Sequence, residues 1–215
     1  MKKEIELIMF DLDGTLADTG QDLTRALNHV RARFNLEPLQ DRLIHGYVGR
    51  GSEFLLRSFL PEKIQLRFEE ALRLFLDHYE EHLLDTTVLY PSVEETLRYF
   101  REKKKAVVTN KYHRFTLPVL KGLGIDGWFD AILGGDNVPR KKPDPAPLHQ
   151  VLHRFGVSPT RAVMVGDSET DMEAGKRAGV HTCGVSYGLG RREEMMKSEP
   201  DFFIDDLHQL TEYFW

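Results

Sequence analysis

The sequence predicts a doubly wound α/β fold, with a Rossmann-like parallel sheet covered by helices on both faces and interrupted early by a helical bundle. Three observations favour it. An apolar run at residues 5–9 ends in two acidic residues, residues 18–84 show helical periodicity throughout, and strands alternate with helices from Tyr90 onward. Strict alternation of this kind is typical of a parallel sheet.

The first strand carries two acids where it ends. Residues two apart in extended chain point the same way, so Asp11 and Asp13 are expected on one side, just past the carboxyl end of the strand. Two carboxylates this close are costly to ionise together unless a cation lies between them, and Mg²⁺ is the natural partner. The alternative is that Asp-x-Asp-Gly is only a turn that caps the strand.

A helical block follows this motif. Apolar residues recur at spacings of three and four over residues 18–34, and a second helix begins at Ser52 and stops before Pro61. A longer helix is predicted from Ile64 to Leu83. We therefore expect a helical cap domain at residues 18–85, inserted into a catalytic core of residues 1–17 and 86–215.

The remainder of the chain repeats a strand and helix unit. Ser92 and Glu95 have the spacing of a capping box that opens the first of these helices. Strands are expected at residues 106–108, 131–133, 162–165, 181–185 and 202–204. Helices are expected at residues 92–103, 115–123, 148–155, 171–178 and 207–213.

Composition excludes several classes of protein. The 215 residues are 41% hydrophobic and 29% charged, which is ordinary for a soluble globular protein. A net charge of -5 argues against a general nucleic-acid binder, because no basic surplus exists to neutralise a phosphate backbone. The single cysteine, Cys183, excludes a disulfide within the chain, and no run approaches membrane-spanning length. We expect a cytoplasmic protein with no membrane partner.

Polar residues follow three of the later strands, and the carboxyl ends of parallel strands share one edge of the sheet. They are Thr109 and Asn110, then Lys141 and Lys142, then Asp167 and Asp171. Carboxylates select a hard cation, whereas a hydroxyl, turn amides and a lysine select an anion. A metal and an anion beside an aspartate nucleophile predict phosphoryl transfer through an aspartyl-phosphate.

The motifs DLDGTL, VVTN, KKPDP and GDSETD, in this order and roughly at these distances, resemble the signature of the haloacid dehalogenase superfamily of phosphohydrolases. The resemblance spans essentially the whole chain. The stretches YPSV, TNK and GGD, together with KKP followed by PAPL, make it most similar to the phosphoglycolate phosphatases.

This resemblance implies roles for the acidic residues. Asp11 would be the nucleophile, and Asp13 would be the general acid and base that protonates the leaving alkoxide and later activates water. Mg²⁺ would be bound by the Asp11 carboxylate, the Asp13 main-chain carbonyl and Asp167. Asp171 would order the metal's water molecules and Lys142.

The same resemblance implies an anion site. Thr109 and the Asn110 amide would hold phosphate oxygens, and Lys142 would offset the charge on nucleophile and phosphate. Lys141 is the alternative lysine, but Lys142 is preferred because it directly precedes the proline of the motif.

The resemblance also implies that the cap closes over the site and contacts the part of the substrate that is not phosphate. The glycine-rich loop at residues 46–52 is the best candidate for that contact. Arg50 could pair with a substrate carboxylate, assisted by the amides of Gly51 and Ser52. The alternative is a helix-joining turn with a solvated arginine.

The sequence therefore predicts a Mg²⁺-dependent phosphatase for a small phosphorylated metabolite, with 2-phosphoglycolate as first choice. A pyrophosphatase, or a phosphotransferase similar to β-phosphoglucomutase, is the alternative on the same frame. A phosphate-sensing binding module is the non-enzymatic alternative. The chain could act as a monomer or a homodimer.

Overall fold

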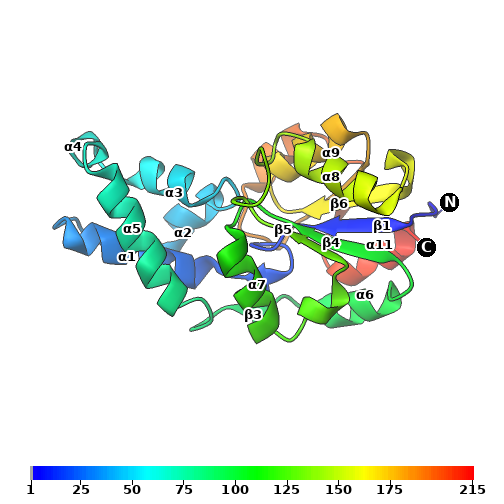
Figure 1. Cartoon of the computed structure of the whole chain (residues 1–215), viewed down its shortest axis with the longest axis horizontal. Coiled ribbons are helices and arrows are strands. Elements are labelled where there is room, and N and C mark those ends of the chain that lie inside the picture. The colour runs from blue at the N-terminus through cyan, green and yellow to red at the C-terminus, as the bar shows by residue number, and fades with distance from the viewer. Residues whose placement is uncertain (1) are drawn as a thin grey trace.

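The computed structural model describes residues 2–215, and a six-stranded sheet lies at its centre (Figure 1). The strand order is β5-β4-β1-β6-β7-β8, and every pairing is parallel. The strands are β1 (Leu7–Phe10), β4 (Lys104–Val108), β5 (Ala131–Leu133), β6 (Ala162–Gly166), β7 (His181–Val185) and β8 (Phe202–Ile204). The predicted parallel α/β fold is confirmed.

Both faces of the sheet are covered by helices (Figure 1). Successive side chains of a strand point to opposite faces, so Leu7 and Met9 pack with α8 and α9, whereas Ile8 and Phe10 belong to the core that includes α6, α7 and α11. These helices are α6 (Val93–Tyr99), α7 (His113–Gly122), α8 (Ala146–Phe155), α9 (Glu169–Ala178) and α11 (Leu210–Tyr213). A further short helix, α10 (Arg192–Lys197), was not predicted.

The strand order fixes where a ligand can bind. The chain runs from β1 outward to β4 and β5, and then returns to the other side of β1 as β6. Phe10, the last residue of β1, lies level with Val107 of β4 and Val165 of β6. The segments that follow these three strands diverge at this point and leave a crevice at the carboxyl edge of the sheet.

The helices inserted after β1 lie beyond that edge (Figure 1). We call them the helical lobe, which consists of α1 (Gly20–Arg33), α2 (Asp41–Ile44), α3 (Ser52–Phe59), α4 (Glu62–Gln65) and α5 (Phe68–Glu81). The single helix predicted from Ile64 to Leu83 is wrong, because the chain breaks between α4 and α5 at Leu66, which is 93% exposed. Ile64 and Phe68 are both buried across the break, so the apolar period continues through it.

Two short strands join the lobe to the sheet. Strand β2 (Ala17–Asp18) pairs antiparallel with β3 (Val88–Leu89), so the chain enters and leaves the lobe side by side. Beside them the buried carboxylate of Asp22 accepts hydrogen bonds from the N–H groups of Thr86 and Thr87 at 3.0 and 2.9 Å, and from their hydroxyls at 2.6 and 2.8 Å. Asp22 therefore links α1, the first helix of the lobe, to residues 86 and 87, where the chain leaves the lobe.

We expect Asp22→Ala to lower the free energy of unfolding by about 2–3 kcal/mol, because it leaves buried donors unpaired. Burial alone would raise the pKa of Asp22, but the hydrogen bonds from Thr86 and Thr87 lower it below its ordinary value. Because the pKa of Asp22 is lower in the folded protein than in the unfolded one, its carboxylate stabilises the fold at pH values above the unfolded-state pKa. This contribution to stability is lost as the pH falls through the folded-state pKa.

The measurement is urea unfolding of both proteins at about pH 7 and about pH 3. The wild type should lose more stability than Asp22→Ala between these pH values. The control is Asp41→Ala at the exposed start of α2, which should change stability by less than about 0.5 kcal/mol. An Asp22→Ala protein as stable as this control would contradict the prediction.

Another local prediction is wrong. Ser92 precedes α6, but its backbone is left-handed, with φ of 62°, and its hydroxyl donates to Asp206 at 2.9 Å. The structure therefore lacks the capping box that Ser92 was expected to form. The reason is tertiary, because Asp206 is brought to Ser92 from the far end of the chain.

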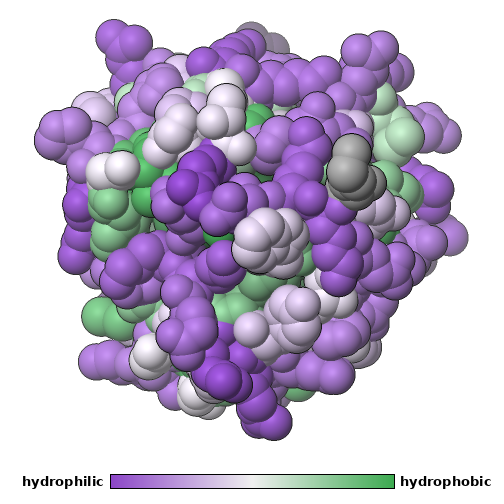
Figure 2. Space-filling model, turned by 90° about the vertical axis from the view of Figure 1, so that its right-hand side faces the viewer, coloured by the Kyte–Doolittle hydropathy of each residue, from purple (hydrophilic) through white to green (hydrophobic). Residues whose placement is uncertain are grey.

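The surface at the end of the molecule opposite the lobe is mostly hydrophilic, with apolar residues scattered between polar ones (Figure 2). Within residues 2–215, no helix has both the length and the apolar character that crossing a membrane requires.

Candidate active site

The crevice at the end of β1 holds a lysine between two aspartates. Asp11, 1% exposed, directly follows β1, and the ammonium nitrogen of Lys142 lies 3.2 Å from its Oδ1 and 2.5 Å from Oδ1 of Asp171. Burial alone would lower the pKa of Lys142, but the two carboxylates raise it above its ordinary value. Lys142 therefore remains a cation.

Three buried carboxylates gather around this lysine. Oxygens of Asp11, Asp167 and Asp171 all lie within 4.8 Å of one another. Burial raises the pKa of Asp11 to about 7 although Lys142 lowers it, and burial with the charges of Asp171 and Asp11 raises the pKa of Asp167 well above its ordinary value. A bound cation would stabilise all three charged forms, and a set made only of oxygen ligands fits a hard cation such as Mg²⁺.

The loops hold these acids firmly. Oδ2 of Asp167 accepts hydrogen bonds from the N–H groups of Leu189 and Gly190, both at 2.8 Å. Gly14 approaches the same oxygen so closely that a Cβ there would lie 1.9 Å from it, and its φ of +81° also favours glycine. Asp171 accepts from the N–H and hydroxyl of Ser168 at the start of α9.

The carboxylate of Asp13 has different partners. Its Oδ1 accepts a hydrogen bond from the Thr19 hydroxyl at 2.8 Å, and the ammonium of Lys111 lies 2.9 and 3.2 Å from its two oxygens. Asp13 thus has its own cation on the side of the helical lobe, while Asp11 lies with Lys142. The two acids of the motif are held in two separate environments.

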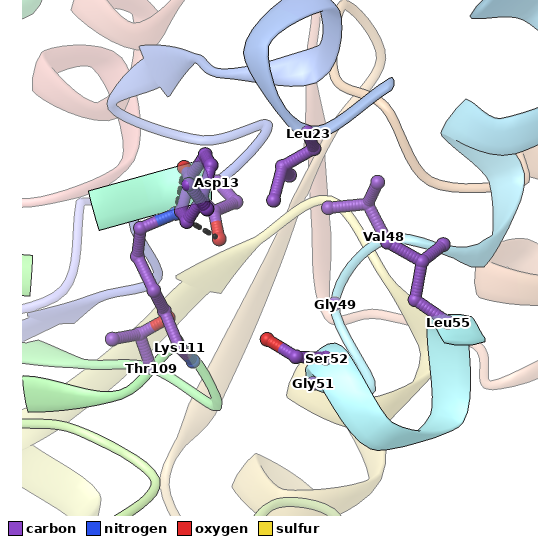
Figure 3. Close-up of a pocket in the computed structure, with 10 residues that line it drawn as sticks. Asp13, Leu23, Val48, Gly49, Gly51, Ser52, Leu55, Thr109 and Lys111 are labelled. Atoms are coloured by element: carbon purple, nitrogen blue, oxygen red, sulfur yellow. Dashed lines mark hydrogen bonds and ion pairs between the residues drawn. The ribbon is translucent and has the colours of Figure 1, made fainter. Parts of the chain in front are cut away.

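Asp13 and Lys111 line a small cavity between sheet and lobe, with apolar side chains opposite them (Figure 3). Its volume is about 20 Å³, which is room for roughly one water molecule. The lining residues are Asp13, Leu23, Val48, Gly49, Gly51, Ser52, Leu55, Tyr79, Thr109 and Lys111. In this arrangement the lobe closes tightly over the site.

This geometry agrees with what comparisons with known proteins show. A model of the haloacid dehalogenase-like hydrolase family matches residues 8–185. The chain belongs to that family. The match covers all four motifs and includes the helical lobe.

This hydrolase is similar to proteins named phosphoglycolate phosphatase. That of Pseudomonas putida is 40% identical over 95% of the chain and 78% of its own length. That of Haemophilus influenzae is 37% identical over 98% of both. A crystal structure from Haemophilus somnus described as a predicted phosphoglycolate phosphatase superposes with a TM-score of 0.88 at 33% identity, covering 97% of each chain. The chain is therefore an enzyme, a phosphoric monoester hydrolase.

The residues predicted to form the anion site lie at the crevice. The Thr109 hydroxyl lowers the pKa of Asp11 through a hydrogen bond. The side-chain amide of Asn110 donates to the main-chain carbonyls of Gly49 and Lys142, both at 2.9 Å. Asn110 thereby links the lobe to the loop of Lys142, and its role toward phosphate stays a prediction. The ammonium of Lys141 lies over the ring of Tyr112, so Lys142 alone of the two lysines contacts Asp11 and Asp171.

Arg50 of the hydrolase lies elsewhere. Its guanidinium donates two hydrogen bonds to Oε1 of Glu169, at 2.8 and 2.6 Å, and it does not line the cavity of Asp13. Gly51, from the same loop, does line it. Contact between Arg50 and the substrate stays a prediction, and in this arrangement Arg50 connects the lobe to the start of α9.

Sequence reasoning missed Lys111. The side chain is 3% exposed, and its ammonium contacts both Asp13 and the Tyr79 hydroxyl of α5. Burial would lower the pKa of Lys111, but Asp13 and Tyr79 raise it above its ordinary value. Two signals were present: Lys111 is the last residue of the stretch TNK, and it directly follows Thr109 and Asn110, where a residue also faces the crevice.

Proposed function

We propose that this hydrolase is a Mg²⁺-dependent phosphatase that hydrolyses 2-phosphoglycolate through an aspartyl-phosphate on Asp11. One observation carries the proposal: the two acids of the first motif have separate environments. Asp11 lies with Lys142 and two further carboxylates, whereas Asp13 faces the cavity under the helical lobe. Such a division suits a nucleophile and a group that gains and loses a proton.

In the first step a carboxylate oxygen of Asp11 attacks phosphorus, and the bond from phosphorus to the substrate oxygen breaks. Asp13 gives its proton to the departing oxygen, so glycolate leaves as an alcohol. Lys142, 3.2 Å from Asp11, offsets the negative charge that nucleophile and phosphoryl group share. The hydroxyl of Thr109, beside Asp11, can donate to a phosphoryl oxygen.

In the second step water replaces Asp11. The Asp13 carboxylate takes a proton from the water as its oxygen attacks phosphorus, and the bond between phosphorus and the Asp11 oxygen breaks. Inorganic phosphate leaves, Asp11 returns as a carboxylate, and Asp13 again carries the proton. The lobe keeps bulk water from the site while the first step takes place.

Asp11 and Asp167 would hold the Mg²⁺ through their carboxylates, together with the Asp13 main-chain carbonyl. When bound, the ion neutralises charge on the phosphoryl oxygens and on the carboxylates. The buried cluster of acids supports this assignment, because burial raises the pKa of Asp11 and of Asp167 and a bound cation would favour their charged forms. Asp171 contacts Lys142 at 2.5 Å and would fix its position.

Two observations favour 2-phosphoglycolate as the substrate. The relatives described above bear the name phosphoglycolate phosphatase over nearly the whole chain. The cavity beside Asp13 has room for roughly one water molecule while the lobe is closed, so every leaving group needs the lobe to move, and one of few atoms needs the least additional space.

We expect phosphate release from 2-phosphoglycolate with Mg²⁺, and at least about a hundredfold loss with a chelator. The measurement ranks 2-phosphoglycolate, sugar phosphates, nucleotides and pyrophosphate by kcat/KM. Preference for pyrophosphate, or transfer of phosphate to a second sugar hydroxyl, would replace this proposal by one of its alternatives. Activity that survives complete metal removal would contradict the metal assignment.

A further inference from the structure

The reaction described above gives no task to the buried cation beside Asp13. Lys111 is 3% exposed, and its ammonium lies 2.9 and 3.2 Å from the two oxygens of Asp13 and 2.5 Å from the hydroxyl of Tyr79. Removing an ammonium from water is costly even when it is paired. Lys111 lines the cavity together with Asp13, so a group bound there would come within reach of its ammonium.

The position of Asp13 defines what comes near Lys111. If Asp13 protonates the departing oxygen, that oxygen lies within hydrogen-bond distance of its carboxylate. The ammonium of Lys111 lies 2.9 Å from the same carboxylate, so the atoms bonded to the departing oxygen come next to Lys111. In an ester of a short 2-hydroxy acid, the carboxylate is attached to the carbon that bears this oxygen.

Lys111 also has the capacity and the surroundings for such a ligand. An ammonium has three N–H donors, and the acceptors near Lys111 among residues 2–215 are the two oxygens of Asp13 and the Tyr79 hydroxyl. A substrate carboxylate would take the donor that now faces the more distant Asp13 oxygen, at 3.2 Å. Opposite it the wall is apolar, formed by Leu23, Val48 and Leu55 (Figure 3). Of the described residues that line the cavity, Lys111 is the one with a positive charge. An anionic group in this cavity would therefore pair with Lys111.

We propose that Lys111 determines specificity by binding the carboxylate that the substrate carries next to its phosphate ester. Tyr79, from α5 of the helical lobe, holds the ammonium in place, so the site is complete when the lobe covers the crevice. Lys111 thus selects phosphate esters of short hydroxy acids over esters of neutral alcohols. The inference rests on the proposed function, since it takes Asp13 to be the group at the departing oxygen.

The test compares 2-phosphoglycolate with ethyl phosphate, which has the same two-carbon skeleton without the carboxylate. The wild type should prefer 2-phosphoglycolate in kcat/KM by at least about tenfold. In Lys111→Met this preference should fall by about tenfold to a hundredfold, because a charge-assisted contact is lost for one substrate only. Lys111→Arg, which keeps the charge, should retain part of the preference.

The matched control is Lys105→Met. Lys105 is also buried, but it lies at the start of β4, at the opposite edge of the sheet. Its ammonium donates to the carbonyls of Phe100 and Lys103, which precede that strand. Its loss should leave the preference for 2-phosphoglycolate unchanged. Thermal unfolding of each variant reports how much stability the buried charge contributes.

Several outcomes would overturn the inference. Equal loss of both activities in Lys111→Met would mean that Lys111 only supports Asp13. A preference that collapses in Arg50→Ala but not in Lys111→Met would make Arg50 the carboxylate-binding residue. If Lys111→Met does not fold, the wild type provides the test. Equal kcat/KM for 2-phosphoglycolate and ethyl phosphate in the wild type would show that the enzyme does not select the carboxylate, and the inference would be wrong. Failure of the proposed function looks different, since neither ester would then release phosphate.

Discussion

Asp11→Asn should abolish turnover, with a fall in kcat of at least about 10⁴-fold, because an amide cannot act as the nucleophile. The variant has the same shape and should fold. It removes one of three buried carboxylates that repel one another, so in the absence of metal its melting temperature should equal or exceed that of the wild type. Lys142 keeps Asp171 as its partner at 2.5 Å.

The measurements are phosphate release from 2-phosphoglycolate and thermal unfolding with and without Mg²⁺. Mg²⁺ should raise the melting temperature of the wild type, and raise that of Asp11→Asn less, because the proposed metal ligand at position 11 has lost its charge. Asp41→Asn, at the exposed start of α2, is the control for the loss of one acid. Turnover retained by a correctly folded Asp11→Asn would exclude Asp11 as the nucleophile.

Asp13→Asn should lower kcat for 2-phosphoglycolate by about 10²–10⁴-fold, because neither the departing oxygen nor the attacking water then exchanges a proton with the enzyme. The substitution keeps a hydrogen-bond acceptor for Thr19 but leaves the ammonium of Lys111 without its counter-ion. Some loss of stability is therefore expected as well, which thermal unfolding will measure.

A substrate with a good leaving group separates the two steps. With p-nitrophenyl phosphate the departing oxygen needs little protonation, so Asp13→Asn should still transfer the phosphoryl group to Asp11 and then stall. Rapid mixing should show a burst of p-nitrophenol equal in amount to the enzyme, followed by slow turnover. Slow release without a burst would show that Asp13 is needed before the aspartyl-phosphate forms.

The sequence predicted the sheet and the meeting of its strand ends because both depend on local patterns. Each core strand is a short apolar run, and parallel strands bring their carboxyl ends together whatever the loops do. Asp11, Lys142, Asp167 and Asp171 therefore converge as expected. The order of strands in the sheet was not predicted, because it depends on packing between distant segments.

The features that sequence reasoning missed are made by long-range contacts. Asp22 meets Thr86 and Thr87 from 64 and 65 residues away, and no periodicity reports such a pairing. Lys111 resembles any solvated lysine until Tyr79 and Asp13 surround it. Arg50 has the chemistry to bind a carboxylate, but the lobe places it against Glu169, a carboxylate of the enzyme itself.

The paired strands β2 and β3 also affect how such an enzyme can evolve. Ala17 lies opposite Leu89 and Asp18 lies opposite Val88, so the two ends of the inserted segment between these strands are adjacent in space. Replacing this inserted segment by one of another length or sequence leaves the order of the six sheet strands unchanged. New substrate ranges can thus arise by replacing this inserted segment, while Asp11 and Lys142 are inherited unchanged.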